Sequence, residues 1–206
     1  MSIIDFPTGI PLRAVNWRQS GGVVRNRSAF TGATRDIRLG PSARWTCDLE
    51  FVPTRSVTAL NLLRDFLAEM AQPGWGFRLR ATEVAQAVSP VPATCLVRGA
   101  NQLGQSLAVD GLNNSATVLT AGALVSVALP NSDEQLIALT ANATSNSSGQ
   151  ATLSLASPLR AAPADNAVVR VHFPIGLMRL SDSAINWTVA PGGVYDFAQL
   201  TAEEWF

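Results

Sequence analysis

Two acidic residues are the chain's best candidates for chemistry. Asp48 and Glu50 stand two positions apart in the segment ARWTCDLEFV, residues 43–52. In an extended strand such side chains leave the same face about 6.5 Å apart. That spacing is at the short end of the range for the carboxyl pair of an inverting glycosidase, about 6.5–9.5 Å. The alternative, which we favour, is the solvated face of a sheet, with Arg44 offsetting the repulsion between the acids.

The other reactive side chains are one histidine and two cysteines. His172 stands between Val171 and Phe173 in a predicted strand, which favours a structural or exposed imidazole over a metal ligand or a triad member. Cys47 and Cys95 are far apart and no CxxC motif is present, so the sequence carries no zinc signature. We therefore expect no catalytic, cofactor-binding or metal-binding residues, and no enzymatic activity.

Charge and hydropathy limit the classes of partner. The 206 residues include fifteen arginines, no lysine and fifteen acids, so the formal net charge is zero. A neutral chain gives no reason to expect nucleic acid or anionic lipid as a partner. The opening segment MSIIDFPTGI contains Asp5 and no basic residue, and no apolar run approaches the roughly 18 residues of a membrane span. We expect a protein folded in the cytoplasm, with a buried, reduced Cys47 and a reduced Cys95.

Strands and one helix are predicted to position the two acids. Strict alternation in residues 43–52 places five side chains on a buried face: Ala43, Trp45, Cys47, Leu49 and Phe51. Before this strand, the segments LRAVNWRQ and VVRNRSAF predict a hairpin over Ser20-Gly21-Gly22. After it, residues 54–72 predict a helix that Thr54 caps and Pro73-Gly74 ends. Its apolar stripe would comprise Val57, Leu60, Leu63, Phe66, Leu67 and Met70.

Composition divides the chain into three parts. Residues 95–174 contain Phe173 as their one aromatic residue, and short apolar alternations there are separated by turn clusters such as GLNNS and SNSSGQ. Five or six short strands at this spacing favour a small barrel or sandwich. Residues 175–206 bring the aromatic residues back and predict a hairpin over Pro191-Gly192-Gly193. We predict a mainly β fold: a β-sandwich with one helix, formed by residues 1–94 and 175–206, interrupted by a β-barrel module at 95–174.

Two groups of motifs resemble the distal tail, or baseplate-hub, proteins of tailed bacteriophages and phage-like particles. The middle part has a glycine-opened strand, a turn at Thr117 to Gly122, and the run from Gly149 to Pro163, GQATLSLASPLRAAP. It resembles the inserted module of such proteins, although Ala123 stands where the family often has an acid. The flanking parts have Phe6-Pro7 with Trp17, Ser28 to Gly32 as an S-x-x-T-G motif, and the strand from Trp45 to Phe51.

The resemblance implies a structural role. In that family a β-sandwich with a helix forms a ring, commonly six-fold, under the tail tube, and the insert is often an OB-like barrel. The expected partners are further copies of the chain, the tail tube protein, the hub and other tail-tip proteins, and the expected location is the virion tail. Residues 1–94 carry a net charge of +4 and residues 175–206 carry −3, which would suit head-to-tail contacts in a ring or pairing within one sandwich.

A different class of function remains as the alternative. The aromatic-poor middle part could be a carbohydrate- or receptor-binding β-module on a particle surface. Sugar-binding surfaces usually present an exposed Trp or Tyr, and residues 95–174 contain neither. We therefore rank this alternative second, and an enzyme third.

Overall fold

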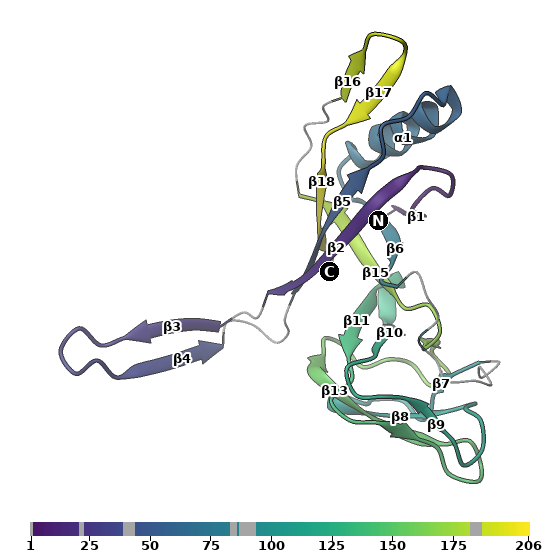
Figure 1. Ribbon diagram of the computed structural model, residues 1–206. Coiled ribbons are helices and arrows are strands. Elements are labelled where there is room, and N and C mark those ends of the chain that lie inside the picture. The colour runs from purple at the N-terminus through teal and green to yellow at the C-terminus, as the bar shows by residue number, and fades with distance from the viewer. Residues whose placement is uncertain (1, 21–22, 39–43, 83–85, 87–93, 182–186) are drawn as a thin grey trace. The chain divides into compact units, whose positions relative to one another are not determined.

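The computed structural model describes residues 2–20, 23–38, 44–82, 86, 94–181 and 187–206. Within them the chain is mainly β with a single α-helix, which confirms the predicted fold class (Figure 1). The chain separates into two compact units. Unit 1 comprises Met1–Gln19, Trp45–Leu79 and Leu177–Phe206, and unit 2 comprises Ser20–Arg44 and Arg80–Gly176.

Unit 1 is built on a six-stranded sheet with the order β1-β6-β15-β18-β5-β2 (Figure 1). The strands are β1 (Ser2–Asp5), β2 (Leu12–Ser20), β5 (Arg44–Phe51), β6 (Trp75–Arg80), β15 (Ile175–Leu180) and β18 (Leu200–Glu204). Strand β1 runs parallel to β6, whereas β18 runs antiparallel to both β15 and β5. The two ends of the chain therefore contribute strands to the same sheet.

The helix α1 (Val57–Met70) begins at Ser56, whose hydroxyl accepts a hydrogen bond from the Ala59 N–H at 3.2 Å. The prediction that Thr54 is the cap is wrong. The Thr54 hydroxyl instead accepts from the Ser56 N–H at 3.1 Å and so holds the capping residue in place. The helix ends at Met70, before Pro73, as the sequence predicts.

The helix packs its apolar side against one face of the sheet and forms the core of unit 1. The buried cluster is Ile10, Cys47, Leu49, Phe51, Leu60, Leu63, Phe66, Leu67, Phe77, Leu79, Met178, Phe197, Leu200 and Ala202. The helix α1 thus covers this face of the sheet. Val57, predicted to belong to the stripe, is 57 % exposed. At about 100° per residue, Val57 lies roughly a third of a turn from the middle of the buried arc.

A small hairpin completes unit 1. Strands β16 (Trp187–Ala190) and β17 (Val194–Phe197) pair antiparallel, and the Gly193 N–H donates to the Ala190 carbonyl at 3.2 Å. This confirms the predicted hairpin over residues 191–193. Tyr195 also forms an isolated bridge with Thr54, which joins this hairpin to the segment before α1.

A second hairpin, β3 (Val23–Arg27) with β4 (Thr34–Arg38), turns at residues 28–33. The sequence predicted a turn at Ser20-Gly21-Gly22 that would pair β2 with β3. Gly21 and Gly22 lie outside the described residues, but the predicted pairing of β2 with β3 is wrong, because β2 belongs to the six-stranded sheet whereas β3 and β4 form a separate two-stranded sheet. Both segments carry turn-forming residues, and the choice between them depends on which strands pair.

In its described residues, unit 2 contains eight further strands in small sheets. They are β7 (Leu96–Val97), β8 (Gly104–Asp110), β9 (Thr117–Leu119), β10 (Leu124–Ala128), β11 (Glu134–Ala138), β12 (Ala143–Thr144), β13 (Ala151–Leu159) and β14 (Val169–Arg170), with a short 3-10 helix, η1 (Pro130–Ser132). Two sheets have the orders β11-β10-β14 and β13-β8-β7, and β9 pairs with β12. The bridges Leu139–Leu155 and Leu96–Val168 link the two larger sheets. The barrel, with its OB-like topology, remains a prediction for this unit.

The core of unit 2 follows from alternation along its strands. In β13 every second residue from Ala151 to Leu159 is buried. Four of them, Ala151, Leu153, Leu155 and Leu159, belong to a hydrophobic cluster, and the fifth, Ser157, is buried but polar. The other members of the cluster are Cys95, Val97, Leu107, Val109, Leu112, Val118, Leu119, Val125, Val127, Leu129, Ile137, Leu139, Ala143, Val169 and Val171. This cluster and the core of unit 1 have no residue in common.

Candidate functional site

The two acids considered for catalysis lie on the face of the sheet opposite α1. The Asp48 side chain is only 9 % exposed, so the prediction of a solvated face is wrong at this position. Its carboxylate accepts hydrogen bonds from the Arg18 guanidinium and, at 2.9 Å, from the Thr201 hydroxyl. The more exposed Glu50 accepts from the Asn16 side-chain amide at 2.9 Å. Both carboxylates are therefore bound to neighbouring strands, as expected of a structural role.

The same face carries further ion pairs and hydrogen bonds between neighbouring strands. Strand β1 contributes Asp5, which faces Arg78 of β6 at 3.8 Å. Arg179 of β15 donates to Glu203 of the adjacent β18 at 2.8 Å. The Asp48 contacts with β18 and β2 continue this pattern to the other edge. We interpret the pattern as cross-strand pairing that fixes the register of the sheet.

Removing the Asp48 carboxylate is expected to destabilise unit 1 more than removing that of Glu50. Asp48→Ala leaves Arg18 and Thr201 without their shared acceptor and should lower the free energy of unfolding by about 1–2 kcal/mol. Glu50→Ala on the same strand removes one exposed contact and should cost less than about 0.5 kcal/mol. Urea unfolding followed by tryptophan fluorescence measures both variants, and equal losses would contradict the structural role given to Asp48.

The two cysteines are free and buried in separate cores, Cys47 in unit 1 and Cys95 in unit 2. Burial raises the pKa of the Cys47 thiol to about 12, and the charge of Asp48 acts in the same direction. Burial, assisted by Asp110, likewise raises the pKa of Cys95 to about 12. Both groups stay protonated at neutral pH, so neither supplies a thiolate nucleophile.

His172 lies in a bend between β14 and β15, and the prediction that it sits in a strand is wrong. Its ring meets Phe173 edge-on, with 4.4 Å between the centroids. The Arg80 guanidinium lies over the Phe173 ring at 4.9 Å. The Nδ1 atom of His172 is buried and has no hydrogen-bond partner among the described residues. The histidine thus belongs to a packed aromatic–cation group.

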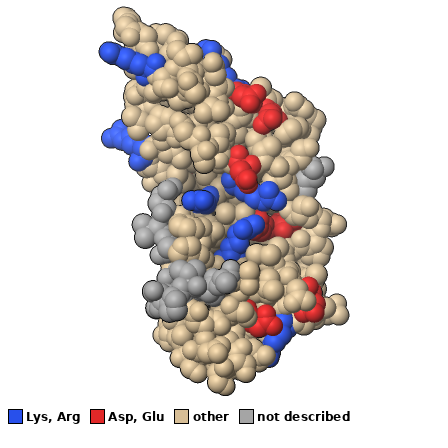
Figure 2. All heavy atoms as spheres, turned by 90° about the vertical axis from the view of Figure 1, so that its right-hand side faces the viewer, with Lys and Arg blue, Asp and Glu red and all other residues tan. Residues whose placement is uncertain are grey.

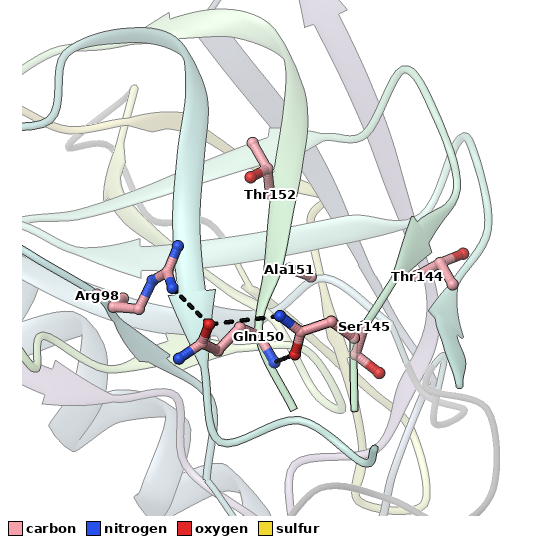
Figure 3. Close-up of a pocket in the computed structure, with 7 residues that line it drawn as sticks. Arg98, Thr144, Ser145, Gln150, Ala151 and Thr152 are labelled. Atoms are coloured by element: carbon pink, nitrogen blue, oxygen red, sulfur yellow. Dashed lines mark hydrogen bonds between the residues drawn. The ribbon is translucent and has the colours of Figure 1, made fainter. Parts of the chain in front are cut away.

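An open pocket of about 340 Å³ lies on unit 2 (Figure 3). Its lining is Arg98, Thr144, Ser145, Asn146, Gln150, Ala151 and Thr152. Arg98 and Gln150 point toward one another, and Arg98 Nη1 donates to Gln150 Oε1 at 2.6 Å (Figure 3). Ser145, Asn146 and Gln150 belong to the SNSSGQ turn cluster, and Ala151 and Thr152 follow it in the run from Gly149. The sequence did not predict a pocket there, because Arg98 reaches Gln150 from a separate segment.

The polar groups of this pocket mainly hold a turn together. Asn146 Oδ1 accepts from the backbone N–H groups of Ser148 and Gln150 at 2.9 and 3.0 Å. The Ser145 hydroxyl donates to the carbonyl of Ala116 at 3.1 Å, so it joins the turn to the segment before β9. The lining offers amide and guanidinium hydrogen bonds to a ligand, but no aromatic ring on which a sugar could stack.

The hairpin β3–β4 differs from the rest of the fold in its exposure. We refer to its described residues, 23–38, as the arm. Every residue from Arg25 to Asp36 is exposed, and the Phe30 side chain at the turn is fully so. Arg25 and Asp36 face each other across the two strands, with a bond of 2.8 Å from Arg25 Nε to Asp36 Oδ1. Residues 25–36 therefore take no part in a buried core.

The turn of the arm is held by local hydrogen bonds. The Ser28 hydroxyl accepts from the N–H groups of Phe30 and Thr31 at 3.3 and 3.2 Å. The Gly32 N–H donates to the Ser28 carbonyl at 3.0 Å, and Gly32 has a positive φ of 68°. The S-x-x-T-G motif seen in the sequence thus forms a defined turn that presents Phe30. In the sequence this motif contributed only to the family resemblance, and the turn was predicted elsewhere.

The face of the molecule seen in Figure 2 carries no large patch of charged side chains of one sign. Most of that face is uncharged, and acidic and basic side chains are neighbours in its middle (Figure 2). Among the described residues, no group of three or more His, Cys, Asp or Glu side chains is placed to hold a metal ion. The same part of the chain contains no helix with the length and hydropathy needed to cross a membrane.

The comparisons with known proteins do not identify a family for this chain. No protein-family model matches the sequence, and none of the curated proteins compared with it matches either.

Proposed function

We propose that this chain is a structural subunit of the tail tip of a bacteriophage or phage-like particle. Copies of it form a ring, six-fold as in the family that the sequence resembles, and the ring joins the tail tube to the baseplate or hub. The tube protein, the hub and other tail-tip proteins are its further partners, and the virion tail is its location.

The observation that carries this proposal is the arm. A two-stranded hairpin is marginally stable in water by itself. From Arg25 to Asp36 the arm is exposed, yet it has a defined turn and an apolar tip at Phe30. Such an element is typical of subunits whose partners cover it after assembly.

The mass of the purified chain in solution tests the proposal. Native mass spectrometry and sedimentation velocity should show, as concentration rises, one closed species whose mass is a whole multiple of the chain's mass. A ring is closed, so growth should stop at that species. A monomer at the highest soluble concentration, or open-ended growth into a continuous distribution, would count against a ring subunit.

The second candidate is a carbohydrate- or receptor-binding module, and the pocket of unit 2 is the observation that favours it. Its hydrogen-bonding groups from Arg98, Asn146 and Gln150 suit a polar ligand. NMR spectra of the chain titrated with a panel of monosaccharides separate the two candidates. Saturable shifts confined to the pocket residues, with no self-association at any concentration, would favour the binding module.

A further inference from the structure

We propose that the arm docks on unit 1 of a neighbouring copy of this chain. This inference rests on the proposed function, since it names the element and the surface through which copies of the ring subunit meet. From Arg25 to Asp36 the arm is an exposed two-stranded ribbon with Phe30 at its turn. The surface that receives it belongs to the unit that holds the six-stranded sheet and α1.

Charge complementarity identifies the second copy as the occupant. Residues 23–38 contain four arginines and one aspartate, a net charge of +3. Unit 1 contains six arginines and nine acids by sequence, a net charge of −3. The remaining residues therefore sum to zero in a chain whose net charge is zero. A neutral chain with opposite charges on two of its parts is complementary to another copy of itself.

The side chains of the arm fit a protein surface. Arg25, Arg27 and Arg35 are exposed, and arginine forms bidentate contacts with carboxylates and is enriched at protein interfaces. Phe30 adds an apolar anchor of the kind that fills a pocket at the centre of a contact. Since the Ser28 hydroxyl bonds hold the turn, little freedom is lost when the tip docks.

Unit 1 offers apolar contacts together with its negative charge. Its exposed large apolar side chains include Trp187 and Val189 on β16, and Val57 at the start of α1, at 43, 56 and 57 % exposure. Trp187 lies beside α1, because the Arg64 guanidinium is 5.0 Å from its ring centre. Asp196, on the strand that pairs with β16, is exposed and can accept from an arginine. Apolar and acidic groups thus match the Phe30 tip and the arginines.

Photo-cross-linking from the tip of the arm in the full-length chain tests the docking. Phe30→p-benzoylphenylalanine keeps an aromatic ring at a fully exposed position, so the fold should be retained. A mixture of isotopically light and heavy copies separates cross-links between copies from those within one copy. We expect links between copies that map to the residues of unit 1. The same probe at Leu103, an exposed apolar residue of unit 2, is the matched control and should give few such links.

A charge reversal tests the complementarity. The double variant Arg27→Glu, Arg35→Glu changes the charge of the arm from +3 to −1 and leaves the Arg25–Asp36 pair intact. We expect the cross-links between copies to fall at least about tenfold at low salt, where electrostatic attraction is least screened. Arg13→Glu with Arg55→Glu makes the same change of charge on exposed residues of unit 1 and should not weaken the cross-linking.

The remaining outcomes distinguish the docking of the arm from the formation of a ring. If the chain forms a closed oligomer but position 30 links only to residues of unit 2, the arm inference is wrong and the ring proposal stands. If the two double variants lose cross-linking equally, charge on the arm has no specific role and the inference is also wrong. If copies neither associate nor cross-link at the highest soluble concentration, both proposals fail.

Discussion

Replacing Phe66 with alanine is expected to lower the free energy of unfolding of unit 1 by about 3–5 kcal/mol. Phe66 of α1 is 1 % exposed and meets two other rings edge-on. The centroid distances are 5.2 Å to Phe6 and 5.1 Å to Phe77. The substitution removes both ring contacts and leaves a cavity where helix and sheet meet.

Tryptophan fluorescence isolates this effect, because all five tryptophans belong to unit 1: Trp17, Trp45, Trp75, Trp187 and Trp205. Leu153→Ala in the core of unit 2 is the matched control, with an expected cost of about 2–5 kcal/mol to that unit. Since the two cores share no residue, the control should leave the fluorescence transition in urea unchanged. A fluorescence transition that shifts equally in both variants would mean that the two units unfold as one.

An alanine at Gly111 should destabilise unit 2 far more than an alanine at Gly122. Both glycines have positive φ, 75° and 86°, so an alanine at either pays about 1–2 kcal/mol for the left-handed backbone. A Cβ at Gly111 would also come within 2.1 Å of the Thr94 carbonyl oxygen. That backbone must move, and the total cost of Gly111→Ala should reach about 2–4 kcal/mol.

Gly122→Ala serves as the matched control, because no atom lies within 4 Å of the position of its added Cβ. The difference between the two variants therefore measures the close approach to Thr94 apart from the backbone cost. Urea unfolding of unit 2, followed by far-ultraviolet circular dichroism, gives both values. Equal losses of unfolding free energy in the two variants would show that the segment before β7 moves away from the added Cβ at little cost.

Local periodicity predicted the elements, since it depends on neighbouring residues alone. The alternation of residues 43–52 predicted a buried row, and its members Trp45, Cys47, Leu49 and Phe51 are buried as expected. Ala43 lies outside the described residues. The burial of Asp48 could not be predicted in this way. Its partners Arg18 and Thr201 are 30 and 153 residues away, and only the order of strands in the sheet brings them together.

The position of the turn in the arm could not be predicted from neighbouring residues either. Ser20-Gly21-Gly22 and the segment from Ser28 to Gly32 both contain residues that favour turns. Local sequence does not decide between them, because the choice depends on whether β3 pairs with β2 or with β4. The sheet order decides between them: β2 is an edge strand with β5 as its neighbour, and β3 and β4 form a two-stranded sheet of their own. The exposure of Phe30 follows from that pairing and was not visible in the sequence.

We propose that copies of this chain form a ring at the tip of a tail. Electron cryomicroscopy of the assembled tail, at a resolution that traces side chains, tests this proposal. The predicted result is a closed ring of copies between the tail tube and the hub, with each arm lying against unit 1 of the adjacent copy. A tail tip that lacks the chain, or holds it as an isolated decoration with no neighbour of its own kind, would contradict the claim.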